Sequence, residues 1–97
     1  MKNTRYDAAR EVASKSDATI ERETASKWAA RTLACYARST AAKTVHEQLK
    51  WRERAKGYRD EALEHAALVG DGGKTVKKIQ RKLDAAARRN RSRTKRK

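Results

Sequence analysis

The sequence predicts an all-α protein. We expect an antiparallel helical hairpin within a small three-to-four-helix bundle or long-helix dimer, followed by a disordered basic C-terminal tail. The 97-residue chain contains 18 Ala, many Lys, Arg and Glu, and no Pro, which is a composition of strong helix formers. Three of its four Gly are clustered in one short segment, so only one break is obvious. Alternating apolar and polar runs are missing, so we expect no strands.

The apolar core should be thin. Leu, Ile and Val together number 11, and Phe is absent, while the net charge is +14. These residues make up about 11% of the chain, well below the ~20% under which a highly charged chain tends to stay disordered. We therefore expect the chain to gain stability by packing against itself, a second copy or a polyanion, and we expect a homo-oligomer.

We predict one helical domain over residues 1–90, with helices at about 4–14, 17–69 and 74–90. The segment Thr44-Val45-His46-Glu47 has the form of a capping box. The long middle helix is therefore either broken near 41–44 or continuous, and the sequence leaves both open. In its first half, small residues would let a partner helix approach closely. The best line there is Ala25, Ala29, Leu33, Tyr36, Ala37 and Thr40, with Ile20 and Trp28 near its start.

Residues 45–69 carry a clearer apolar stripe at steps of three and four. It consists of Trp51, Ala55, Tyr58, Ala62, Ala66 and Val69, widened by Leu49, Leu63 and Leu68. We assign Arg52, Glu53 and Arg59 to the opposite, solvated face.

The segment Gly70-Asp71-Gly72-Gly73 should end this helix and start the next. Gly70 suits the left-handed position past a helix end, and Asp71 can cap the following helix. So short a loop forces the flanking helices into an antiparallel hairpin. We expect Trp51, Tyr58, Val76, Ile79 and Leu83 to hold this hairpin together.

The positive charge is concentrated at the C-terminal end. Residues 1–44 carry a net +4, residues 45–70 are neutral, and residues 71–97 carry +10. In residues 74–90 the basic side chains lie opposite the apolar ones, and residues 91–97 contain no apolar residue and are expected to be disordered. The candidate binding residues are Lys74, Lys77, Lys78, Arg81, Lys82, Arg88 and Arg89 on the helix, and Arg91, Arg93, Lys95, Arg96 and Lys97 on the tail.

This distribution predicts a small, non-enzymatic nucleic-acid-binding protein that contacts the phosphate backbone of DNA or RNA. Gathering so much like charge costs self-repulsion, which a polyanion would remove, and release of its counterions favours association. No residue decides between DNA and RNA, and no element suggests base-specific reading. The alternative is a small helical protein–protein interaction module, such as a phage-type inhibitor, adapter or virion component that binds an acidic protein surface.

Four other patterns suggest chemistry only weakly. Gly73-Lys74-Thr75 ends like a phosphate-binding loop, but Leu68 stands where that pattern needs Gly, so a plain turn is favoured. His65 and Glu61 share a helix face, which favours a solvated pair over half of a metal site. The lone Cys35 is interpreted as a small buried residue rather than a nucleophile.

The fourth pattern is the position of Trp51 and Tyr58 among basic residues, which can stack nucleic-acid bases. Because both lie on the apolar stripe, core packing is favoured.

We expect no enzymatic activity, no metal and no cofactor. The N-terminal residues resemble neither a secretory signal nor a transit peptide, and no apolar run is long enough to span a membrane. A cytoplasmic, nucleoid-associated or virion-internal location is expected.

Overall fold

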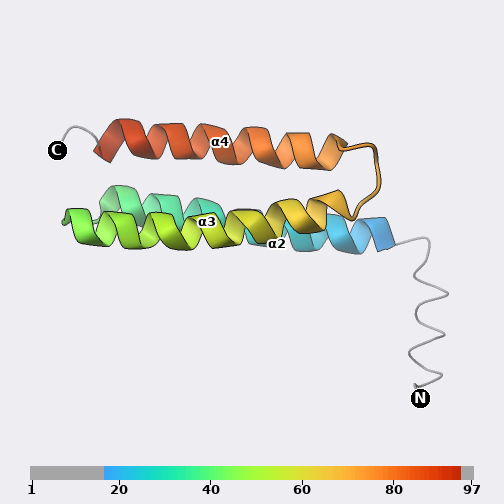
Figure 1. The fold of residues 1–97 in the computed structure, drawn as a ribbon, viewed down its shortest axis with the longest axis horizontal. Helices are drawn as coiled ribbons and strands as arrows, with labels where there is room; N and C mark the ends of the chain where they lie inside the picture. The colour runs from blue at the N-terminus through green and yellow to red at the C-terminus, as the bar shows by residue number, and fades with distance from the viewer. Residues whose placement is uncertain (1–16, 95–97) are drawn as a thin grey trace, which may run out of the picture.

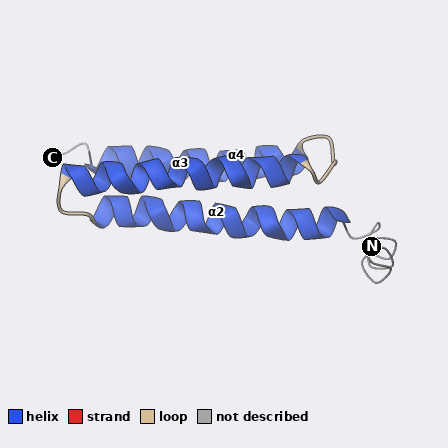
Figure 2. Ribbon diagram, turned by 60° about the horizontal axis from the view of Figure 1, so that its bottom comes forward, coloured by secondary structure: helices blue, strands red, loops and turns tan. Residues whose placement is uncertain are grey.

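A computed structural model describes residues 17–94 of the protein and shows a three-helix bundle. The helices are α2 (Asp17–Ala41), α3 (Val45–Ala67) and α4 (Lys74–Thr94), and this part of the chain contains no strand. Successive helices are antiparallel (Figure 1), and each helix contacts the other two (Figure 2). The all-α prediction and the α3–α4 hairpin are therefore confirmed. The predicted helix at 4–14 and the last three basic residues lie outside the described part.

The question left open near 41–44 is resolved in favour of two helices. Thr44 has an extended backbone, with φ −121° and ψ 154°, and its hydroxyl accepts a hydrogen bond from the Glu47 N–H at 3.1 Å. This is the N-cap interaction that the sequence indicated. Across the turn, the buried Ser39 hydroxyl donates to the Gln48 carbonyl at 3.0 Å, which ties the end of α2 to the start of α3.

The glycine-rich loop between α3 and α4 also behaves as its residues predict. Gly70, Gly72 and Gly73 have φ of 72°, 74° and 86°, a region that glycine adopts without steric cost. Asp71 accepts a hydrogen bond from the Thr75 N–H at 3.2 Å and therefore caps α4. The left-handed position at Gly70 and the capping role of Asp71 are both confirmed.

The apolar core is small and made mostly of alanine. Its buried members are Ala25, Ala29, Ala62, Ala66, Ile79 and Leu83, with Trp28, Leu33, Leu63 and Val76 partly buried against them. Leu83 is the largest fully buried side chain within residues 18–94. Alanine lets the helices approach closely but contributes little apolar area, so the thin core expected from composition is present.

The aromatic residues of α3 do not pack as predicted. Tyr58 stacks against Trp28 of α2 with ring centroids 5.5 Å apart, and Trp51 lies under the guanidinium of Arg38, also from α2. Trp51 is not part of the apolar core. Both rings therefore join α3 to α2, and the predicted residues that seat α4 in the core are Val76, Ile79 and Leu83.

The prediction that the last helix ends at Asn90 and gives way to a disordered tail is wrong for residues 91–94, because α4 continues to Thr94. Arg52 of α3 anchors this extension. Its Nε donates to the Asn90 Oδ1 at 2.7 Å, and its Nη2 donates to the Thr94 hydroxyl. Both acceptor residues are buried, so the extra helical turn is held by hydrogen bonds rather than by apolar side chains.

Asn90 also binds α2. Its Nδ2 donates to the Tyr36 carbonyl at 3.2 Å and to the Thr40 hydroxyl at 2.9 Å. Because Arg52 of α3 bonds to its other end, the 2%-exposed Asn90 side chain joins α4 to both of the other helices. Every polar atom of this buried amide is thus used, as burial of a polar group requires.

The assignment of Arg52 and Arg59 to a solvated face is therefore wrong. Arg52 makes the bonds just described, and Arg59 forms an ion pair with Asp84 of α4, with Nη1 and Oδ1 2.8 Å apart. Conversely, Leu49 and Leu68 were expected to widen the apolar stripe but are 53% and 60% exposed. The contact between α3 and α4 therefore includes two arginines of α3 in addition to apolar residues.

Replacing Leu83 by Ala should lower the free energy of unfolding by ~2–5 kcal/mol, because the loss of a fully buried leucine leaves a cavity. Urea unfolding followed by circular dichroism measures this change. The matched control is Leu49→Ala, which removes the same atoms from an exposed site on α3 and should change stability by less than ~0.5 kcal/mol. Equal effects of the two substitutions would contradict the assigned core.

Replacing Asn90 by Ala should cost ~1–3 kcal/mol, because Arg52 and the Tyr36 carbonyl lose their buried partner. The exposed Ser92→Ala in the same helix is the control and should be nearly neutral. Amide hydrogen exchange in residues 91–94 should accelerate in the Asn90 variant only. Unchanged protection there would show that the network does not hold the last turn.

Candidate nucleic-acid interface

Nine of the twelve predicted binding residues belong to α4, and all nine side chains are exposed. They are Lys74, Lys77, Lys78, Arg81, Lys82, Arg88, Arg89, Arg91 and Arg93. The other three, Lys95, Arg96 and Lys97, lie outside the described residues. The predicted opposition of a basic and an apolar face on this helix is confirmed, since Ile79, Leu83, Ala86 and Ala87 are buried.

The basic side chains of α4 point in more than one direction. At about 100° per residue, Lys74, Arg81 and Arg88 lie on the side opposite Leu83 and face solvent. A second group turns toward α2, because Lys78 and Lys82 line one cavity between the two helices and Arg89 and Arg93 line another. The cations therefore cover both the outer surface of α4 and its edge beside α2.

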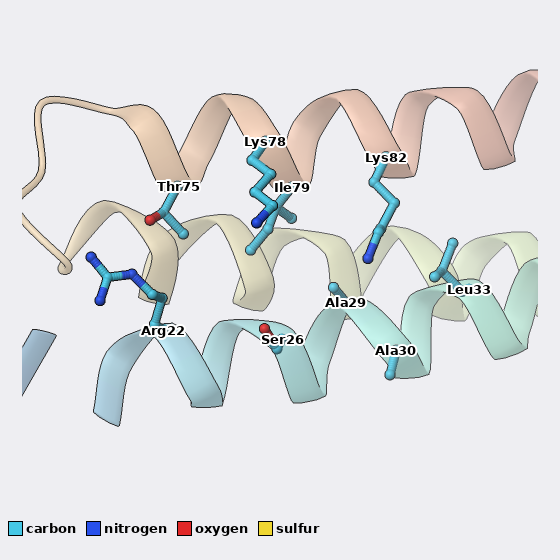
Figure 3. A pocket seen from close by; sticks show the side chains of 9 residues that line it. All are labelled: Arg22, Ser26, Ala29, Ala30, Leu33, Thr75, Lys78, Ile79 and Lys82. Carbon is cyan, nitrogen blue, oxygen red and sulfur yellow. The ribbon is translucent and has the colours of Figure 1, made fainter. Parts of the chain in front are cut away.

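The two cavities follow one another along the groove between α2 and α4, and Leu33 lines both of them. Figure 3 shows one half of it, with the Lys78 and Lys82 ammonium groups pointing toward α2. The α2 wall consists of Arg22, Ser26, Ala29, Ala30 and Leu33 in one half and of Leu33, Tyr36, Ala37, Thr40 and Ala41 in the other. It carries no carboxylate in either half, so it does not neutralise the basic residues of α4. We call this feature the α2–α4 groove.

None of the nine α4 cations forms an ion pair with a carboxylate in residues 18–94. The only acidic residue within α4 is Asp84, which is engaged by Arg59 of α3. The other nearby carboxylate, Asp71, lies 3.8 Å from Arg22 of α2. The fold therefore uses cations of other helices for its ion pairs and leaves those of α4 available.

The glycine-rich loop does not add a phosphate site to this surface. The Asp71 carboxylate accepts from both the Thr75 N–H and the Thr75 hydroxyl, the latter at 2.6 Å, so an anion already occupies the start of α4. These hydrogen bonds, foremost that from the Thr75 hydroxyl, lower the pKa of Asp71. A carboxylate in that position repels phosphate, which supports the interpretation of this segment as a plain interhelical turn.

His65 is paired with carboxylates, and Cys35 is buried. His65 Nδ1 lies 2.8 Å from Glu21 Oε1 of α2, and its Nε2 lies 3.8 Å from Glu61 Oε1, so the expected pair with Glu61 is joined by a closer contact across helices. Residues 18–94 hold no group of three side chains suited to a metal ion. Cys35 is 4% exposed, and burial raises the pKa of its thiol, which keeps it protonated and weakly nucleophilic.

Comparison of the chain with protein-family models, curated protein sequences and solved structures gives no match. None of the three helices is both long and apolar enough to cross a membrane. The chemistry of the surface is therefore the basis for a functional proposal.

Replacing Asp71 by Ala should lower the melting temperature at neutral pH, because α4 loses its cap. Since the pKa of Asp71 is lowered from its ordinary 3.8 in the folded protein, its stabilising effect is fully present above pH 3.8. That effect is lost as the pH falls through the lowered folded-state pKa. Thermal melts should therefore show the wild-type and Ala variants converging in acid.

The control for this measurement is Asp71→Asn, which keeps an acceptor oxygen and should be less destabilised than the Ala variant at neutral pH. A difference between wild type and Asp71→Ala that is the same at neutral and acidic pH would contradict the capping role.

Proposed function

We propose that this protein binds nucleic acid non-enzymatically, through phosphate contacts made by α4, its C-terminal basic residues and the α2–α4 groove. The observation that carries the proposal is the set of nine exposed α4 cations with no carboxylate partner among the described residues. A surface of this kind attracts a polyanion over a long range and releases counterions from the phosphates it meets.

The groove supports backbone contact rather than base reading. Lys78 and Lys82 are one helical turn apart, about 6 Å along the axis, and both reach over a wall of small α2 side chains. Ser26, Ala29 and Ala30 leave room beside these two lysines for a phosphate group, while Arg22, Leu33 and Tyr36 are the larger α2 side chains of the groove. Gln80 is the only exposed amide side chain of α4, and α4 has no aromatic residue. The helix therefore offers few side chains that could form base-specific hydrogen bonds.

Replacing both Lys78 and Lys82 by Gln should weaken binding to short duplex DNA, duplex RNA or single strands, whichever the wild type prefers. Each phosphate-contacting cation contributes about 0.9 to the slope of log affinity against log salt on B-DNA, so the slope should fall by about 2. Fluorescence anisotropy at a series of salt concentrations measures both quantities and identifies the preferred nucleic acid.

The matched control is Lys27→Gln with Lys43→Gln, which removes the same charge from exposed positions outside α4 and the groove. It should change the salt slope by much less. If both double variants reduce affinity equally, binding depends on net charge and not on this surface. Salt-insensitive capture of one protein that survives nuclease, with no affinity for nucleic acid, would overturn the proposal in favour of a protein-interaction module.

A further inference from the structure

A second cationic feature lies on the seam between α2 and α3. The guanidinium carbon of Arg38, from α2, and that of Arg54, from α3, each lie 5.0 Å from the ring centroid of Trp51. Both arginines are exposed and the ring is half-buried. We call these three residues the arginine–tryptophan patch. About two turns earlier on α2, Arg31 lies in the same way over Trp28, at 4.9 Å.

The patch lies on the side of the bundle away from α4. On α3, Arg52 is bonded to α4, and Arg54 follows it by two residues, which places it about 200° around the helix. On α2, Thr40 is bonded to Asn90 of α4, and Arg38 precedes it by two residues, again about 200° around. The same rotation on two helices therefore separates the patch from the α2–α4 groove.

The patch keeps its positive charge. Neither Arg38 nor Arg54 forms an ion pair with a carboxylate in residues 18–94. The buried Cys35 thiol interacts electrostatically with both arginines, but burial raises its pKa against their effect, so the thiol stays neutral. Two like charges are thus held close together on one ring, an arrangement that a bound anion would relieve.

The chemistry of the patch suits nucleic acid. A guanidinium stacked on an indole is held in one orientation, so it loses less freedom when its N–H groups bind a phosphate oxygen pair. Guanidinium planes also stack on exposed bases, which lysine ammonium groups cannot do. Trp51 is the only large apolar residue of the patch, and the guanidinium groups of both arginines lie over its ring.

We propose that the arginine–tryptophan patch binds a second segment of nucleic acid, so that one molecule bridges two segments held on opposite sides of the bundle. This inference rests on the proposed function of α4 and adds a second, separate contact surface to it. Bridging of this kind brings two duplexes, or two parts of one strand, to within the width of a three-helix bundle.

The test uses duplex DNA immobilised on beads and a second, fluorescent duplex of equal length in solution. The full-length wild-type chain should retain the fluorescent duplex on the beads. The double variant Arg38→Gln with Arg54→Gln should reduce the retained fraction at least about fivefold, while its affinity for a single duplex changes less than about threefold. The control Lys27→Gln with Lys43→Gln removes equal charge from exposed lysines that are not part of the patch and should retain the second duplex.

Sedimentation equilibrium on the same samples reports the oligomeric state, and circular dichroism reports folding. Retention that is unchanged in the arginine variant would overturn the proposal and assign bridging to self-association. Wild-type binding to one duplex without retention of a second would also overturn it, while leaving the proposed function of α4 intact. Failure of the wild type to bind even one duplex would instead remove the proposed function, and the bridging inference with it.

Discussion

The buried amide of Asn90 is the contact on which the arrangement of the bundle depends. The apolar core is too small and too rich in alanine to fix how the helices slide or rotate against one another, because a methyl side chain does not interlock with a neighbouring helix as a larger side chain does. Asn90 bonds to a backbone carbonyl and a hydroxyl of α2 and to a guanidinium of α3, so it accepts only one register. That register also sets the direction in which each basic side chain of α4 points. It therefore places Lys78, Lys82, Arg89 and Arg93 in the α2–α4 groove.

Local features of the fold follow from the sequence alone. The cap at Thr44, the left-handed Gly70 and the burial of Ile79 and Leu83 depend on neighbours within a few residues or on simple helical periodicity. The Arg52 network was missed for the opposite reason. Arg52 and its partners Asn90 and Thr94 are 38 and 42 residues apart, and a polar residue is assigned to solvent unless its distant partner is known.

The candidate site divides in the same way. A run of lysine and arginine is visible in the sequence, and helical periodicity places its described members either opposite the buried face or at its edges. The groove is not visible there, since it depends on how α2 is turned toward α4, and α2 is rich in small residues without a clear apolar stripe. The stacking of Arg38 on Trp51 likewise joins different helices. The spacing of Trp51 along α3 predicted a core position, but the spacing carries no information about the arginine on α2 that covers the ring.

The dominance of alanine in the core has a consequence for how much of the protein is folded at any time. Because Leu83 is the largest fully buried side chain among the described residues, burial of large apolar side chains contributes comparatively little to stability, while the uncompensated charge on α4 favours expansion. A ligand that binds only the native state and supplies negative charge then contributes to stability through mass action as well as through screening. The folded population thereby becomes a function of polyanion concentration, and released molecules become the better substrates for proteolysis.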